Sequence, residues 1–106
     1  MRKAKVLYKN KEAGELTQLD DASFVFEYNK EWLSDESCPP ISLSFPKKES
    51  VFSAESLFPF FYHLLPEGKA KKEISQKYKI DEEDAFGILL HSAQYDTIGA
   101  IKIIKI

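Results

Sequence analysis

Cysteine is nearly absent from this 106-residue chain, which contains only Cys38. A single thiol excludes an intramolecular disulfide and any zinc site built from several cysteines. Glycine is scarce as well, at four residues, and neither Gly-x-Gly-x-x-Gly nor Gly-x-x-x-x-Gly-Lys-Ser/Thr occurs. The sequence therefore predicts no glycine-rich phosphate loop, no cofactor and no metal site.

An excess of positive charge is also missing, since 15 basic and 17 acidic residues leave a net charge of −2. Nucleic-acid-binding domains usually carry a basic excess, because phosphate contacts supply much of their affinity. No apolar run approaches the roughly 20 residues of a membrane-spanning helix, and no apolar segment follows the basic N-terminus as in a signal peptide. We therefore expect a cytoplasmic protein that binds neither nucleic acid directly nor membranes.

Apolar and aromatic residues are abundant, at 43% and 13% of the chain. This composition is typical of a globular protein with a hydrophobic core. The length suits one domain, spanning residues 1–106. A lone tryptophan, Trp32, is either a core residue or an interface anchor, and its position beside Leu33 favours the core.

Short alternating segments separated by turn residues dominate the first third of the chain. Residues 3–8, 13–17 and 23–28 show this pattern and predict an antiparallel meander. The alternation of 41–45 ends at a proline and predicts an edge strand. The β-branched segment 98–106 predicts a last strand that returns to this sheet.

Helical spacing of apolar residues appears in the second half. Ser53 is expected to cap a first helix, which Pro59 either kinks or delays until about Phe58. A basic helix is expected at 69–78, and a third at 82–91 capped by Asp81. The predicted fold class is therefore α+β: a small antiparallel sheet of N-terminal strands plus a C-terminal strand, packed with about three helices.

Catalytic groups are not evident. His63 and His91 are the only histidines, and neither has a recognisable partner residue, so both are interpreted as structural or surface residues. No serine lies in a Gly-x-Ser-x-Gly motif. We expect a protein that is not an enzyme.

Two surface features remain open to interpretation. Five lysines between 69 and 79 indicate either an anionic partner or a solvated helix face with a Lys69–Glu73 pair, and the negative net charge favours the solvated face. Pro66 and Gly68 suit a corner between helices, which is either a simple turn or an exposed partner contact.

Six motifs in order resemble the N-terminal subdomain of HipA-type kinases over nearly the whole chain. They are Gly14-Glu15-Leu16, Phe24-x-Phe26-x-Tyr28 with Trp32-Leu33, Pro40-Ile41-Ser42-Leu43-Ser44-Phe45-Pro46, Phe60-Phe61-x-x-Leu64-Leu65-Pro66-Glu67-Gly68, Phe86-x-x-Leu89-Leu90 and Asp96-x-x-Gly99-Ala100. HipA-type proteins are bacterial serine/threonine kinases, the toxins of toxin–antitoxin systems. In the full-length kinases this subdomain precedes the kinase core and packs against it.

The resemblance implies a regulator, because the catalytic elements of the kinase core are not among these 106 residues. Some systems of this family divide the protein into a HipB-like helix-turn-helix repressor, a shortened HipT-like serine/threonine kinase and a small HipS-type protein similar to this subdomain. We expect an antitoxin that inhibits the kinase in trans. The alternatives are a scaffold that tunes repressor–operator binding and a fragment of a longer HipA-type kinase. The corner Pro66-Glu67-Gly68-Lys69 is the expected kinase contact.

Overall fold

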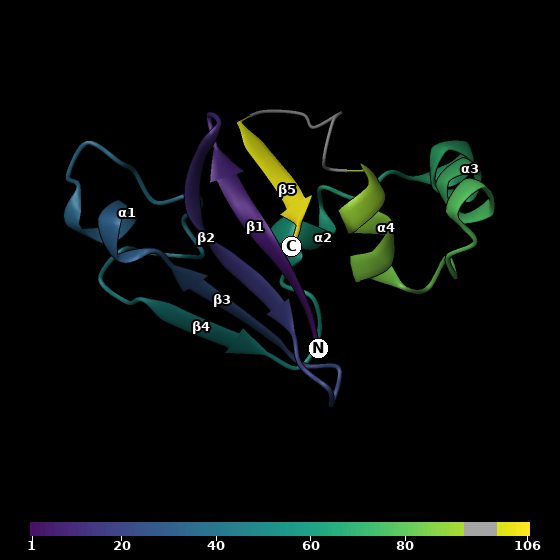
Figure 1. The fold of residues 1–106 in the computed structure, drawn as a ribbon, viewed down its shortest axis with the longest axis horizontal. Coiled ribbons are helices and arrows are strands. Elements are labelled where there is room, and N and C mark those ends of the chain that lie inside the picture. Colours follow the sequence, from purple (N-terminus) through teal and green to yellow (C-terminus); the bar gives the residue numbers. More distant parts are fainter. Residues whose placement is uncertain (93–99) are drawn as a thin grey trace.

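The computed structural model describes residues 1–92 and 100–106 and contains a five-stranded antiparallel sheet of order β4-β3-β2-β1-β5 (Figure 1). The strands are β1 (Arg2–Tyr8), β2 (Lys11–Gln18), β3 (Phe24–Tyr28), β4 (Val51–Ala54) and β5 (Ile101–Lys105). The helices of the described residues are α1 (Lys30–Ser34), α2 (Pro59–Tyr62), α3 (Gly68–Tyr78) and α4 (Ala85–Ser92). The predicted α+β class is confirmed, with four helices, of which α3 and α4 are the substantial ones.

The N-terminal meander forms as its alternation predicts. Ala4 and Val6 of β1 point into the core, while Lys3 and Lys5 point to solvent. The sequence predicts a turn at Asn10 and Lys11, and the structure places the turn to β2 one residue earlier, at Lys9 and Asn10. Both residues have positive φ angles, of 51° and 68°, as a two-residue hairpin with right-handed strand twist requires.

Gly14 lets β3 approach β2 closely. It lies opposite Tyr28 in the register of the two strands. A Cβ atom at this position would overlap the carbonyl oxygen of Glu27 and lie 3.0 Å from the Cα atom of Tyr28. The local backbone spacing therefore requires glycine.

The last strand, β5, closes the sheet by pairing with β1, with Ile103 opposite Val6. This pairing confirms the predicted return of the C-terminal segment to the N-terminal sheet. Ile101 and Ile103 of β5 are both buried in the core. The predicted strand began at Ile98, but Ile98 and Gly99 lie outside the described residues. The same holds for the motif that starts at Asp96, apart from Ala100.

Aromatic side chains fill the core on one face of the sheet, where α2 lies behind the strands in the view of Figure 1. The Phe26 ring lies 4.9 Å from that of Phe45 and 5.7 Å from that of Phe61, measured between centroids. Trp32 is 2% exposed and donates its indole N–H to the Pro39 carbonyl at 2.9 Å. The core interpretation of Trp32 is thus confirmed.

The edge strand is not the predicted one. Residues 41–45 form bends and turns, and the edge strand beside β3 is β4, which contains the expected helix cap Ser53. The Tyr28 hydroxyl explains the turns, because it donates to the Phe45 carbonyl at 2.5 Å and accepts the Ile41 N–H at 3.1 Å. These bonds satisfy backbone groups that a strand would otherwise pair.

The helix that we expected after Ser53 is α2, and it begins at Pro59 after Phe58, as the alternative prediction stated. Proline suits this position because its missing N–H has no partner in a first turn. The basic helix α3 matches its prediction closely. The last helix starts at Ala85 rather than at 82, since Asp84 and not Asp81 accepts the N–H of Gly87 at 3.1 Å.

The helices are all short. Within the described ranges, none combines the length and the apolar character that crossing a bilayer demands.

A candidate partner-binding corner between two helices

The segment Pro66-Glu67-Gly68-Lys69 connects the end of α2 to the start of α3. The chain leaves α2 through a turn in which the Leu65 N–H donates to the Tyr62 carbonyl at 3.1 Å. Gly68 opens α3 with a φ of +58°, a conformation that glycine adopts without steric cost. The Glu67 side chain does not cap the helix. The corner is therefore shaped by its backbone, and the Glu67 carboxylate is not used to build it.

The corner is accessible to a partner. Glu67, Gly68 and Lys69 are exposed, and Pro66 is half-buried. An exposed loop held by a rigid scaffold is a common place for binding residues. The expected exposure is thus present, whereas the contact with a kinase remains a prediction.

A pocket of about 340 Å³ lies against this corner. Its lining residues are Tyr62, His63, Leu65, Pro66, Glu67, Gly68 and Lys71. The structure therefore brings Pro66, Glu67 and Gly68 together at the pocket and leaves Lys69 outside its lining. Sequence reasoning missed Tyr62, His63 and Lys71, because their approach depends on the turn after α2.

Tyr62 is the largest exposed apolar surface at this site, with 55% of its area exposed. Tyrosine contributes strongly to protein interfaces, since its ring buries much apolar area while its hydroxyl can still bond. The exposed ring beside a pocket therefore offers apolar area to which a partner side chain can bind.

The two histidines are separate from each other and serve different local roles. The exposed His63 ends α2, and its backbone N–H donates to the Pro59 carbonyl at 3.0 Å. His91 places Nδ1 2.9 Å from the Gly87 carbonyl, and its ring lies tilted against that of Tyr78, with 4.4 Å between centroids. In residues 1–92 and 100–106, no three acidic, histidine or cysteine side chains gather as a metal site would need.

A second cavity, of about 420 Å³, lies at the β1–β2 hairpin beside Trp32 and Cys38. The Lys11 amino group lies 3.4 Å from both the Cys38 sulfur and an Asp35 oxygen. The hydrogen bond to Cys38, followed by that to Asp35, raises the pKa of Lys11. At this cavity, Lys11 is therefore already bound to Cys38 and Asp35 within the fold.

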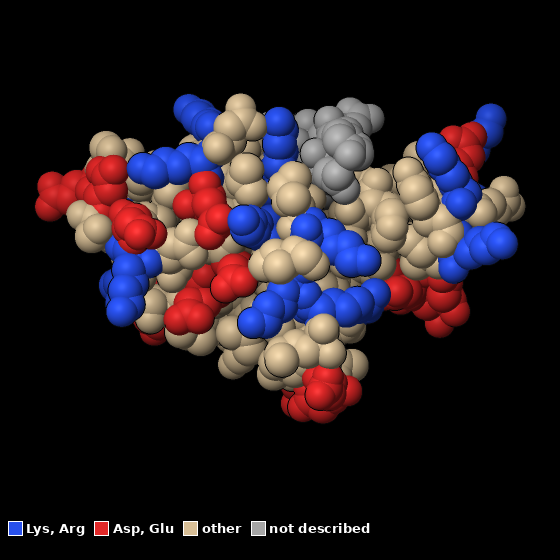
Figure 2. Space-filling view, in the orientation of Figure 1, with Lys and Arg blue, Asp and Glu red and all other residues tan. Residues whose placement is uncertain are grey.

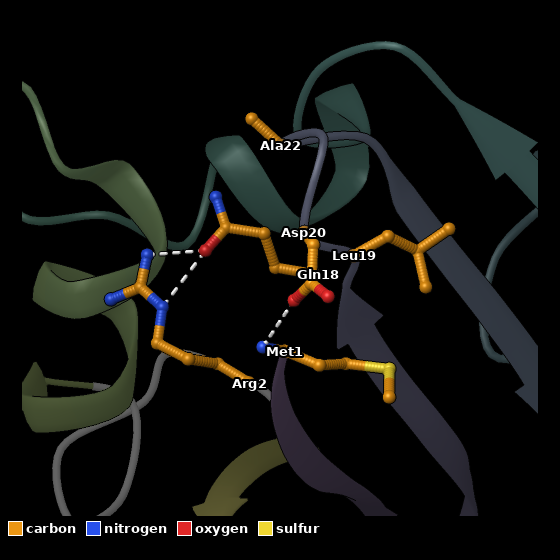
Figure 3. A pocket seen from close by; sticks show the side chains of 6 residues that line it. All are labelled: Met1, Arg2, Gln18, Leu19, Asp20 and Ala22. Carbon is orange, nitrogen blue, oxygen red and sulfur yellow. Dashed lines mark hydrogen bonds and ion pairs between the residues drawn. The ribbon is translucent and has the colours of Figure 1, made fainter.

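A third cavity, of about 260 Å³, lies where β1 begins and β2 ends (Figure 3). The Arg2 side chain bonds Gln18 there, through Nε at 2.8 Å, and the Met1 amino group pairs with Asp20 at 2.7 Å. These groups too are engaged within the fold. The corner pocket differs in that an exposed aromatic ring lines it.

One interpretation of the basic helix needs correction. The expected pair between Lys69 and Glu73 is not formed, because no carboxylate in the described part of the chain lies within 4 Å of the Lys69 amino group. The residues are correctly spaced on α3, but both side chains are exposed. An exposed pair of this kind contributes only a few tenths of a kcal/mol, about 0.3–0.5, and solvation competes with it.

Comparisons with known proteins agree on one family. A family profile described as "HipA N-terminal domain" matches residues 4–104. A solved structure titled "N-terminal domain of HipA toxin" superposes with a TM-score of 0.73 at 33% identity, covering 100% of this chain and 93% of that one. An uncharacterized protein of Haemophilus influenzae is 38% identical over 88 residues, which are 83% of this chain and 78% of the relative.

Longer relatives match through one part only. The Sinorhizobium fredii protein named "Putative kinase Y4mE" is 33% identical over 91 residues, covering 86% of this chain and 21% of that protein. A second protein of that organism, named "Putative kinase Y4dM", is 31% identical over 94 residues, covering 83% and 23%. The chain thus spans about a fifth of the length of these two relatives.

Proposed function

The chain belongs to the HipA N-terminal domain family, and we propose on that basis that it is a non-enzymatic subunit that binds and inhibits a HipT-like serine/threonine kinase in trans. In this proposal it is the HipS-type antitoxin of a tripartite toxin–antitoxin system. The family match occupies residues 4–104, and no kinase catalytic domain is among the 106 residues.

A domain that packs against a neighbouring domain has a surface complementary to it, and this supports binding in trans. In the longer relatives named as kinases, a segment similar to this chain makes up about a fifth of the protein. A domain that packs on a neighbour within one chain carries a complementary surface, which can bind the same neighbour in trans at the cost of association entropy. No chemistry of its own is then required for regulation.

The observation that carries the proposal is the exposed corner with its pocket. Pro66, Glu67 and Gly68 belong to the longest of the motifs by which the chain resembles the kinases, and they line a pocket of about 340 Å³ beside the exposed Tyr62. A rigid corner with an exposed aromatic ring can contact a kinase near its active site without any loss of the fold.

Co-expression with the HipT-like kinase of the same operon tests the proposal. Size-exclusion chromatography detects the complex, and a growth assay detects relief of kinase toxicity. Co-elution with restored growth is the expected result. Co-elution without restored growth, together with a changed operator affinity of the repressor, would instead favour the scaffold role, and the absence of any complex would contradict the proposal.

A further inference from the structure

One exposed apolar side chain differs from all the others in the described ranges. Leu43 is 99% exposed, more than any other large apolar residue there. Met1 follows at 70%, but it is the first residue of the chain, and terminal residues are commonly exposed. A leucine that stays almost wholly in water contributes no burial free energy to folding. The fold itself therefore does not explain why an apolar residue stands at position 43.

Leu43 lies at the apex of a β-turn. The Phe45 N–H donates to the Ser42 carbonyl at 3.0 Å, so Leu43 and Ser44 are the two central residues of the turn. Turn centres favour proline, glycine, asparagine, aspartate and serine, each because of its backbone geometry or its hydrogen bonding. Leucine has neither property. The turn therefore does not require leucine at its apex either.

The turn is fixed at both ends by buried residues. Ile41 and Phe45 are both buried, and the Tyr28 hydroxyl bonds their backbone groups at 3.1 and 2.5 Å. Leu43 is thus presented by a backbone that is already ordered. A partner that binds this side chain needs to order little of the chain, which favours affinity.

The turn and the corner pocket lie on the same side of the sheet. The rings of Phe45 and Phe61 are 5.7 Å apart, and both pack on Phe26 at the core side of β3. Phe61 directly precedes Tyr62, the exposed ring of the corner pocket. The other side of the sheet carries charged side chains of both signs (Figure 2), as is usual for a solvated antiparallel sheet. The exposed apolar residues Leu43 and Tyr62 therefore belong to neighbouring elements on the side that is not charged in this way.

We propose that Leu43 is a second anchor of the kinase interface and inserts into an apolar pocket of the partner kinase. This inference rests on the proposed function and specifies the chemistry of the kinase surface beyond the corner. The turn lies within the motif at 40–46 by which the chain resembles HipA-type kinases, and it packs against the helix that leads to the corner. Because Leu43 is so exposed, almost its whole side chain is available for burial in a complex.

Truncation of this side chain tests the inference. Leu43→Ala is compared with Ile106→Ala, which shortens another exposed aliphatic residue. Calorimetry measures binding to the purified HipT-like kinase. We expect the Kd of Leu43→Ala to rise about tenfold and that of the control to change less than about twofold. Leu43→Asn, which is similar in size but polar, should bind no better than Leu43→Ala.

Thermal unfolding separates a role in binding from a role in the fold. Leu43→Ala should unfold at the same temperature as the unmodified protein, because the side chain is not buried. A clear loss of stability would show that Leu43 serves the fold and would overturn the inference. An unchanged Kd would also overturn it while leaving the proposed function intact, since Leu43 does not line the corner pocket.

Two further outcomes concern the identity of the partner. Failure of the unmodified protein to bind the kinase would overturn both the inference and the proposed function. Analytical ultracentrifugation shows whether the chain associates with itself. Self-association that Leu43→Ala abolishes, with unchanged kinase affinity, would identify a second copy of the chain as the occupant and would overturn the inference.

Discussion

Arg2 and Asp84 bind each other across 82 residues of sequence. Two guanidinium nitrogens of Arg2 donate to the two carboxylate oxygens of Asp84, at 3.0 and 2.8 Å. Arg2 opens β1, and Asp84 immediately precedes α4, so this bidentate pair fastens the start of the helix to the start of β1. Asp84 also accepts the Gly87 N–H and thereby completes the first turn of α4.

Replacement of Asp84 by alanine removes the ion pair with Arg2 and the helix cap at Gly87 at once. We expect Asp84→Ala to lower the free energy of unfolding by about 1–2 kcal/mol, mostly through loss of the helix cap and partly through the ion pair. Urea denaturation measures the change. Glu82→Ala is the control, since Glu82 is exposed and makes no side-chain bond in the described residues. Equal effects of the two changes would contradict this role.

Asp35 makes stability depend on pH in the acid range. Hydrogen bonds from the Ser37 hydroxyl and N–H, at 2.6 and 2.9 Å, lower the pKa of its carboxyl from 3.8 to about 2. A lowered pKa in the folded state means that the contribution is present above about pH 4 and is lost as pH falls through about 2. Arg2 lowers the pKa of Asp84 in the same direction.

Carbon NMR titration of the Asp35 carboxyl is therefore expected to give a midpoint near 2. Asp35→Asn should flatten the loss of stability between about pH 4 and pH 2, whereas Glu36→Gln, an exposed neighbour, should leave the slope unchanged. A midpoint close to 4 would show that the Ser37 bonds are not formed in solution.

Gly14 and Gly68 require glycine for different reasons and should respond differently to alanine. A Cβ at Gly14 collides with the Glu27 backbone, so Gly14→Ala should force β2 away from β3. We expect the free energy of unfolding to fall by about 3 kcal/mol or more. At Gly68 a Cβ meets nothing within 4 Å, and the cost of a positive φ is about 1 kcal/mol. Thermal unfolding of both variants tests this order, and a larger loss at Gly68 would reverse it.

The corner itself is tested by Glu67→Ala/Lys69→Ala. We expect inhibition of the kinase to weaken by about tenfold, because the variant removes two side chains of the proposed contact. The circular dichroism spectrum should stay unchanged, because both side chains are exposed. Lys48→Ala/Glu49→Ala removes the same two charges from an exposed loop and should leave inhibition intact. Unchanged inhibition by the corner variant would place the contact elsewhere.

Prediction from sequence succeeded where neighbouring residues decide the structure. The alternation at Ala4 and Val6 marks β1, and the turn at Lys9 and Asn10 lies within one residue of its predicted place. The basic helix was found to within a residue, and so was the helix start at Pro59, because proline restricts its own backbone.

Prediction failed where a distant group decides. The alternation at 41–45 is as regular as that of a strand, yet the Tyr28 hydroxyl binds backbone groups at both ends of this segment. Likewise, Asp81 has the features of a helix cap, but α4 begins three residues later, where Arg2 holds Asp84. Neither partner can be identified from the spacing of residues along the chain.

The candidate site shows the same division. A corner between helices was predicted from Pro66 and Gly68, whereas the pocket with Tyr62, His63 and Lys71 was not. The pocket is formed by residues of α2, of α3 and of the segment between them, so it depends on how the two helices are oriented.

By itself, the sequence determined the α+β class, the N-terminal meander, the returning last strand and the family, because periodicity, proline and glycine positions and ordered motifs are local properties of the chain. Only the tertiary structure decided which segment became the sheet edge, where α4 begins, and which side chains meet at the corner. These depend on pairings such as Arg2 with Asp84 and Tyr28 with Phe45, in which packing brings together groups that are distant in sequence.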